Sequence, residues 1–212
     1  MNRPDFSDYL VHFSTDEAPK GGIDGNPVGN ISALSAKDRI ISILNEKTIR
    51  ASSMPWTGAK AVCFIECPWS SLLAHTQVYS PYGVGFTKKT IFSQHVGPAI
   101  YIRTDVFNKQ KNSGAFAGLL WSFITPFSPA YRPYSMKKAK YDIGTCDYTH
   151  EREWRTPHDF KFEYNQIEFV ILNSHSDLVD FPENLKNEIG IDKFIIMDNY
   201  KFVETLWPVH KI

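Results

Sequence analysis

The last third of the sequence is a series of short apolar runs separated by turn-forming residues, and this spacing limits the fold more than any other feature. Four runs of this kind, at residues 153–156, 167–172, 193–197 and 202–207, are expected to be β-strands. A helical turn is expected only at residues 183–188. Because strands and helices do not alternate regularly, the sequence predicts an α+β domain with a strand-rich core.

The earlier part of the sequence mixes helix and strand. Ser35 precedes Asp38 by three residues, so it is expected to cap a helix that ends near residue 46. The run AVCFIE at residues 61–66 is apolar enough for a central strand. Further strands are expected at residues 8–14, 48–51, 82–87 and 98–103, and further helices at 69–76 and 115–124.

Length and composition favour one domain. The 212 residues are 42% hydrophobic, which is enough for one substantial core, and no linker divides residues 1–212. Neither a run of about eighteen apolar residues nor a signal-peptide pattern occurs, so a cytoplasmic protein without membrane contact is expected. The odd number of cysteines, three, fits reduced thiols and predicts no metal site.

The charge balance excludes a basic field over the whole protein, because 23 basic side chains face 23 acidic ones. A nucleic acid would therefore have to bind a local patch. The candidates are Lys88 with Lys89, Lys109 with Lys111, and the loop at residues 131–141, where lysines are interleaved with tyrosines able to stack on bases. The alternative is a solvated loop whose tyrosines fold back against the core.

The stretch THEREWRTP at residues 149–157 concentrates charge in a segment expected to be extended. In a strand, Glu151, Glu153 and Arg155 would share one face. Two carboxylates on one face repel each other unless a cation or a polar ligand lies between them. The pair is therefore a candidate for a cleft, and the alternative is an exposed edge strand with ion pairs to Arg152 and Arg155. The common hydrolase, phosphate-loop and zinc-protease motifs are absent.

The order of these pieces is more specific than any one of them. The segments VHFS, ISILNEKTIRAS, VCFIECPWSSLLAH and GPAIYIR, followed by the glutamate strand, resemble the nucleic-acid-directed ADP-ribosyltransferase toxins of the DarT type. They also look like the abortive-infection families whose last motif reads Glu-x-Glu-Trp-Arg. The resemblance covers roughly residues 9–172. It implies an ADP-ribosyltransferase-like split, strand-rich core that binds NAD as co-substrate.

The same resemblance implies roles for individual residues. Glu153 would accept a hydrogen bond from the nicotinamide-ribose 2′-hydroxyl, and Glu151 would orient or deprotonate the acceptor. A fixed carboxylate of this kind stabilises the positive charge that builds on the ribose. His12 would hold the adenosine-side ribose, Ser14 would bind the nicotinamide amide or a ribose, and Phe13 would lie beside them. Tyr82 would stack against the nicotinamide ring, and Arg50, or else Arg39, would contact the pyrophosphate.

Two of these residues also have ordinary structural interpretations. His12 fits a hydrogen-bonded histidine at a strand end, and Tyr82 fits a packing aromatic. The sequence departs from the DarT-type pattern at residues 51–61 (ASSMPWTGAKA), where those toxins carry an arginine-rich stretch. A second catalytic cation and the acceptor therefore stay unassigned.

The resemblance leads to one expected function and two alternatives. The expected function is an NAD-dependent ADP-ribosyltransferase that modifies RNA or single-stranded DNA as a toxin in anti-phage defence, restrained by a neutralising antitoxin protein. One alternative is an NAD glycohydrolase, for which water is the acceptor. The other is a catalytically inactive module of the same fold that recognises a nucleotide or a protein through the loop at residues 131–141.

Overall fold

The structure is a computed structural model, and it describes residues 6–16, 34–66, 72–73, 76, 79–114, 118–129 and 147–206. The lysine- and tyrosine-rich loop at residues 131–141 and most of the helix expected at 69–76 lie outside the described residues.

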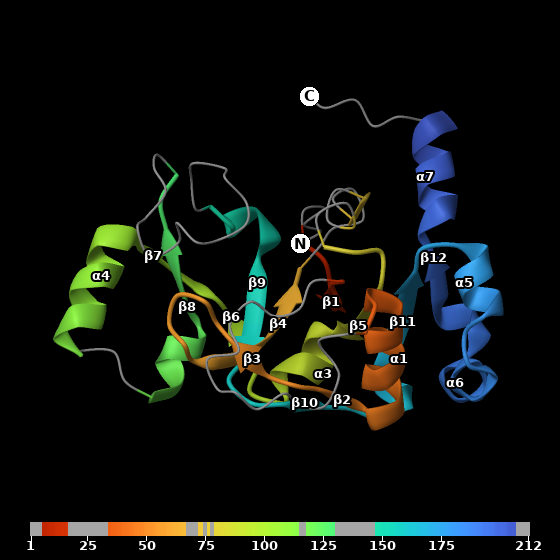
Figure 1. The fold of residues 1–212 in the computed structure, drawn as a ribbon, viewed down its shortest axis with the longest axis horizontal. Helices are drawn as coiled ribbons and strands as arrows, with labels where there is room; N and C mark the ends of the chain where they lie inside the picture. Colours follow the sequence, from red (N-terminus) through yellow and green to blue (C-terminus); the bar gives the residue numbers. More distant parts are fainter. Residues whose placement is uncertain are drawn as a thin grey trace.

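A central, mostly antiparallel sheet forms the middle of the molecule (Figure 1). Its eight strands follow the order β12-β11-β5-β1-β4-β9-β6, and β3 pairs with β4 beside this path. Only the pair β11 and β12 is parallel among the pairings of this sheet in the described residues. The strands are β1 (Tyr9–Phe13), β3 (Ser52–Ser53), β4 (Lys60–Ile65), β5 (Gly83–Thr87), β6 (Gly97–Pro98), β9 (Glu153–Thr156), β11 (Ile167–Leu172) and β12 (Phe194–Ile196).

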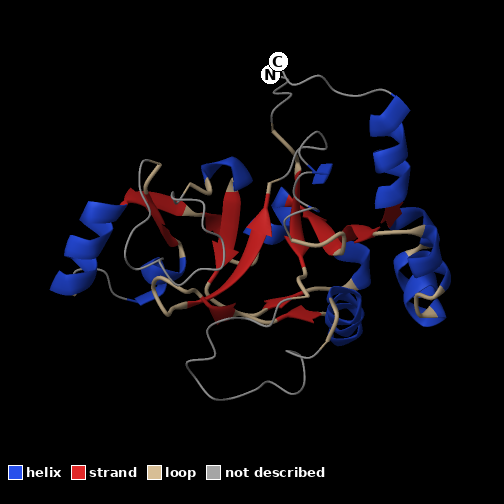
Figure 2. Ribbon diagram, turned by 45° about the horizontal axis from the view of Figure 1, so that its top comes forward, coloured by secondary structure: helices blue, strands red, loops and turns tan. Residues whose placement is uncertain are grey.

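A smaller lobe lies beside the β6 edge of this sheet, at the left of Figures 1 and 2. Its own two-stranded sheet pairs β7 (Ile100–Arg103) with β8 (Ile124–Phe127) in parallel. The helix α4 (Thr104–Ser113) and the 3-10 helix η2 (Gly118–Ser122) lie between these two strands in the chain. The lobe is therefore one continuous stretch of chain that begins directly after β6.

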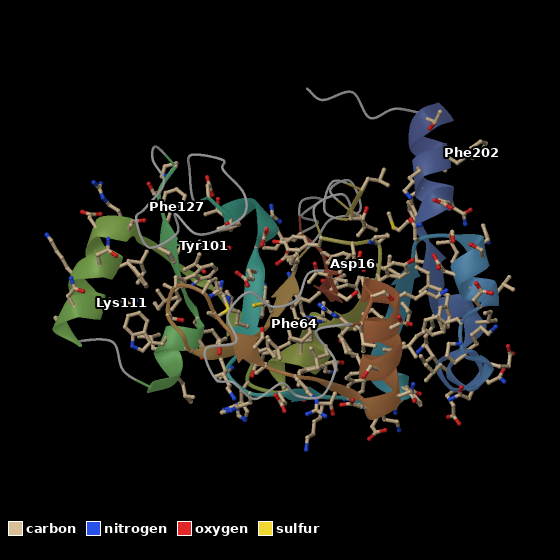
Figure 3. All side chains as sticks on the ribbon, in the orientation of Figure 1. Asp16, Phe64, Tyr101, Lys111, Phe127 and Phe202 are labelled. Carbon is tan, nitrogen blue, oxygen red and sulfur yellow. The ribbon has the colours of Figure 1, made fainter. Side chains whose placement is uncertain are left out.

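Helices lie at the opposite end of the sheet. The helix α1 (Ala36–Glu46) begins at Ser35, whose hydroxyl accepts a hydrogen bond from the backbone N–H of Asp38. After the sheet, α7 (Met197–Leu206) extends away from the body, and Figure 3 shows Phe202 pointing outward from it. The remaining helical segments are α3 (Lys88–Phe92), η4 (Thr149–Glu151), η5 (Tyr164–Gln166), α5 (His175–Val179), α6 (Glu183–Ile189) and η6 (Ile191–Lys193).

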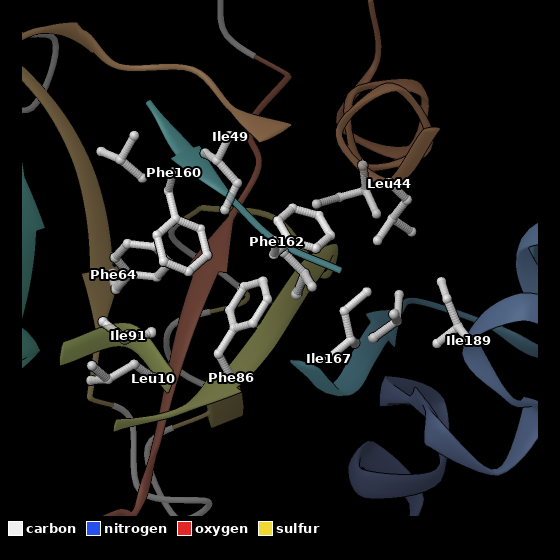
Figure 4. Packing of buried hydrophobic residues seen from close by; sticks show 14 of the residues in the cluster. Leu10, Leu44, Ile49, Phe64, Phe86, Ile91, Phe160, Phe162, Ile167 and Ile189 are labelled. Atoms are coloured by element: carbon white, nitrogen blue, oxygen red, sulfur yellow. The ribbon is translucent and has the colours of Figure 1, made fainter. Parts of the chain in front are cut away.

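The two faces of the sheet bury different clusters, because alternate residues of a strand point to opposite faces. The larger cluster holds a group of edge-to-face phenylalanine rings (Figure 4): Phe64, Phe86, Phe160 and Phe162. The strand pair β2 (Thr48–Ile49) and β10 (Phe160–Lys161) covers this face. The smaller cluster, on the other face, includes Val11 and Ile65.

The observed fold confirms the α+β class and corrects two elements. The expected helix at residues 115–124 is wrong: the described part of this stretch forms η2 and the start of β8, and the helix is α4, directly before it. The expected strand at 202–207 is also wrong, because its described residues belong to the helix α7. The capped helix at 35–46 and the strands at 61–66, 82–87 and 167–172 are confirmed within a residue or two.

No helix among the described residues is both long enough and apolar enough to cross a membrane.

Candidate functional site

The strand part of the charged stretch, β9, lies inside the sheet, and residues 149–151 form the 3-10 turn before it. The strand β9 pairs with β4 on one side and with β6 on the other, so it is not an exposed edge. Glu151 precedes the strand and ends the 3-10 turn η4, and Arg152 then takes a left-handed conformation with φ 44°. The expectation that Glu151 and Glu153 lie along one strand is therefore wrong. The turn nevertheless brings both carboxylates into buried positions.

Arg155 is the most deeply buried charged side chain of the site, with 0% exposure. Its Nε donates to Glu153 Oε1 at 2.9 Å, and its Nη2 donates to Glu153 Oε2. Nη2 also donates to Thr125 Oγ1 at 2.6 Å, and Nη1 donates to the carbonyls of Ser122 at 3.3 Å and Ile124 at 3.1 Å. These bonds use all five N–H donors of a guanidinium. Arg155 thus joins β9 to the lobe.

Glu151 has a different partner. Its side chain is buried, and the hydroxyl of Tyr79 donates to Oε1 at 2.5 Å. Burial raises the pKa of Glu151 to about 7, the hydrogen bond from Tyr79 lowers it, and the nearby charges of Glu153 and Arg155 act in opposite directions. The carboxyl of Glu151 therefore gains or loses its proton near neutral pH.

Aromatic and thiol groups complete the wall around the two glutamates. Trp56 stacks on Tyr148 with ring centres 6.3 Å apart, and its Nε1 donates to the carbonyl of Ile124 at 2.6 Å. Tyr101 donates its hydroxyl to the carbonyl of Tyr148 at 2.9 Å. Burial raises the pKa of Tyr101 and of the Cys63 thiol, so both stay neutral near pH 7. Sequence reasoning missed these residues and Tyr79, because no local motif marks side chains that meet only in the folded chain.

His12 lies on β1 in a packed environment. Its Nδ1 is 2.9 Å from the carbonyl oxygen of Cys63, and since a carbonyl only accepts, Nδ1 carries the proton. The imidazole also makes an edge contact with Phe64, with ring centres 6.0 Å apart. Burial lowers the pKa of His12, which favours the neutral ring.

Strand alternation separates His12 from the glutamates. Val11 pairs with Ile65, and Ile65 pairs with Glu153, so these three side chains share a face of the sheet. His12, next to Val11, points to the opposite face, where it meets the phenylalanine cluster. Phe13 returns to the face of Val11 and packs beside the smaller cluster.

Ser14 and Tyr82 meet at a third place, beyond the end of β1. The hydroxyl of Ser14 donates to the carbonyl of Ala36 at 2.8 Å and to that of Tyr82 at 3.3 Å. The hydroxyl of Tyr82 donates to Asp177 at 3.1 Å, and Lys37 forms an ion pair with the same carboxylate at 3.1 Å. Both residues are thus fixed by contacts between β1, α1 and α5.

Arg50 lies at a fourth place, on the surface, where it forms an ion pair with Glu46 at 2.8 Å. The structure therefore brings Glu151 and Glu153 together. Of the five expected cofactor-binding residues, Phe13 shares their face of the sheet, and the other four lie elsewhere: His12, Ser14, Tyr82 and Arg50. Among the described residues, no group of histidine, cysteine or carboxylate side chains is arranged to hold a metal ion. NAD binding and catalysis stay predictions from the sequence.

A comparison with protein-family models identifies the chain. The model described as "Putative abortive phage resistance protein AbiGi, antitoxin" matches residues 38–189, more than two thirds of the sequence. The chain belongs to the AbiGi family. The AbiGi match spans α1 to α6 and includes all of β9. No curated protein and no solved structure matches significantly, so the ADP-ribosyltransferase-like form of the α+β fold is not confirmed.

The AbiGi match corrects the family and the function expected from the sequence. The family is described as an antitoxin, so the expected ADP-ribosyltransferase toxin acting on nucleic acid is wrong. The abortive-infection setting is confirmed. The error has a physical source: Glu-x-Glu-Trp-Arg is a short motif, and here its second glutamate and its arginine form a buried ion pair that holds a strand in place.

Proposed function

We propose that this AbiGi chain is the antitoxin of an abortive-infection system, and that it restrains its toxin by binding the toxin protein. The observation that carries the proposal is the family match over residues 38–189. The match covers the lobe and the strands of the central sheet from β3 to β11, including β9 with the glutamate site, so the proposal concerns the main body of the fold.

The geometry of the glutamate site supports a binding protein. The carboxylate of Glu153 accepts from two nitrogens of Arg155, and the remaining donors of Arg155 bind the lobe. Hydrogen bonds of this kind fix one arrangement of strand and lobe, because removing either partner would leave a buried charge unpaired. In this proposal the charges of Glu153 and Arg155 hold the strand and the lobe in one arrangement, and the outer surface of that arrangement contacts the toxin.

The charge balance supports a protein as the partner. With 23 basic and 23 acidic side chains, the chain has no net charge to attract a polyanion. Interfaces between proteins rely on apolar and aromatic side chains at the centre of the contact and on few charges there. Neutralisation by protein contact is thus the mode that agrees with the composition.

Growth rescue tests the proposal. Each open reading frame that flanks the gene is expressed from an inducible promoter, with and without this chain. One of them is expected to arrest growth alone, to be harmless with the chain, and to co-purify with it. If none is rescued, or if the chain alone arrests growth, the antitoxin assignment fails. The control is Phe86→Asp, which should unfold the buried phenylalanine cluster and lose rescue.

Paired surface variants then locate the contact. Exposed apolar side chains occur on α7, as Phe202 and Val203, and on η2, as Leu119 and Leu120. Phe202→Ser with Val203→Ser removes the first pair, and Leu119→Ser with Leu120→Ser removes the second. Both double variants should fold, because these side chains are largely exposed. Loss of co-purification in one of them, with the other unchanged, assigns the side of the molecule that meets the toxin.

A further inference from the structure

The glutamate site holds two buried carboxylates and one buried cation. Arg155 donates from two nitrogens to Glu153. Its remaining N–H groups donate to Ser122, Ile124 and Thr125. No N–H donor of the guanidinium is left for Glu151. Charge in the described part of the site therefore balances only when Glu151 is protonated.

Among the residues that the structure describes, the other groups facing Glu151 do not supply the missing positive charge. Tyr79 offers a hydroxyl, and Tyr101 and Cys63 lie within electrostatic range. Burial raises the pKa of all three groups, so they are neutral near pH 7. Of the charged groups, Glu153 opposes ionisation of Glu151 and Arg155 favours it.

The position of Glu151 couples its charge to the backbone. Glu151 is the last residue of η4, and its N–H donates to the carbonyl of Tyr148 at 3.0 Å. The next N–H, of Arg152, donates to the carbonyl of Thr149 at 3.3 Å. The bond from Tyr79 is the side-chain link between this turn and a segment 72 residues earlier in the chain.

We infer that Glu151 is a proton-operated latch, which holds the turn at residues 148–152 closed against Tyr79 when it is protonated and releases the turn when it is ionised. Opening lets water solvate the carboxylate, which removes the cost of a buried charge beside Glu153. The hydrogen bond from Tyr79 is stronger to a carboxylate than to a carboxyl group and works against opening. Burial outweighs it, as the raised pKa of about 7 indicates. The latch needs no partner and goes beyond the antitoxin proposal.

Hydrogen exchange measures the latch directly. The purified full chain is exchanged at pH 6 and pH 8, and protection of peptides covering residues 147–152 is corrected for the intrinsic dependence of exchange on pH. In the wild type, protection at the amides of Glu151 and Arg152 should fall by about tenfold between pH 6 and pH 8, because the contribution of the proton is lost as the pH rises to the midpoint and does not change above it. In Glu151→Gln the protection should not depend on pH. An equal change in both proteins, or none in the wild type, would overturn the inference.

Two further measurements keep the test decisive if Glu151→Gln folds poorly. Tyr79→Phe removes the bond that favours the carboxylate, so the midpoint should move to higher pH. The midpoint itself is read from the side-chain carboxyl carbon of Glu151 in glutamate-labelled protein by NMR. Glu163→Gln is the matched control, because the Glu163 carboxylate is exposed and forms its ion pair with Lys47, which is not part of the glutamate site. A Glu151 midpoint at the ordinary glutamate value of 4.5 would contradict the latch.

Discussion

Arg155 and Glu153 form an ion pair within one strand, two residues apart and on one face of β9. In most proteins a pair at this spacing lies on a solvated strand face and contributes little. Here the arginine is fully buried and the glutamate is 8% exposed, so neither charge can exchange its partner for water. The pair is thus a condition for folding of this part of the sheet.

Removal of the arginine should therefore be costly. Arg155→Met leaves Glu153 buried without its cation, and we expect a loss of about 3–5 kcal/mol in the free energy of unfolding, measured by urea denaturation. The double variant Arg155→Met with Glu153→Gln should recover part of this loss. The control is Arg50→Met, which breaks the exposed pair with Glu46 and should change the free energy of unfolding far less, because both charges remain solvated. Equal losses at the two arginines would contradict the argument.

Global stability should depend on the proton at Glu151. Its folded-state pKa of about 7 lies above the ordinary glutamate pKa of 4.5, so the folded protein holds the proton more tightly than the unfolded chain does. The contribution to stability is complete below about pH 4.5, declines as the pH rises, and is lost above pH 7. The wild type should lose on the order of 3 kcal/mol over this window relative to Glu151→Gln. Denaturation at several pH values checks the difference, and parallel curves would refute it.

His12 should give a pH dependence of the opposite sign. Burial lowers its pKa below the ordinary histidine value of 6.5, so the unfolded chain binds the proton more readily. Its contribution is present above about pH 6.5 and is lost as the pH falls. His12→Gln, which can still donate to the carbonyl of Cys63, should show a flatter stability profile from pH 7 to pH 5 than the wild type. An unchanged slope would mean that His12 is solvated.

Gly85 should not tolerate a side chain. A Cβ built there would lie 2.4 Å from two carbons of the Phe169 ring, a distance that forces the ring to move. Gly85→Ala is expected to cost about 1–3 kcal/mol. Adding Phe169→Leu should restore part of the loss. Gly97→Ala is the matched control, because its nearest contact would be an ordinary 3.7 Å to Phe123, and its effect should be smaller.

Local signals explain which elements were predictable. Ser35 and Asp38 lie three residues apart, which is the spacing of a helix N-cap, so the sequence alone predicts where α1 begins. The strand β4 is nearly continuous in apolar residues, as buried strands are. The helix α4 (TDVFNKQKNS) buries only Thr104 and Phe107 and shows little apolar periodicity, which is why the sequence predicts a helix in the apolar stretch after it instead.

The site was predictable only in part, for a related reason. The charge of THEREWRTP indicated an unusual environment, and both glutamates are buried. The partner of Glu151, however, lies 72 residues away, and the donors and acceptors of the lobe are backbone groups without a residue signature. The expected toxin function rested on short motifs. The same short motif can occur because a buried strand needs it for packing, and not only because an enzyme needs it for catalysis.

The crossing from the sheet to the lobe takes place at two consecutive amides. The N–H of Ala99 donates to the carbonyl of Glu153 in the central sheet at 2.7 Å, and the N–H of Ile100 donates to the carbonyl of Phe123 in the lobe at 2.8 Å. Arg155 bridges the same boundary through the carbonyls of Ser122 and Ile124. Because consecutive residues bond to the sheet and to the lobe, we expect that the lobe does not unfold independently of the sheet. It should melt in the same cooperative step as the centre of the sheet.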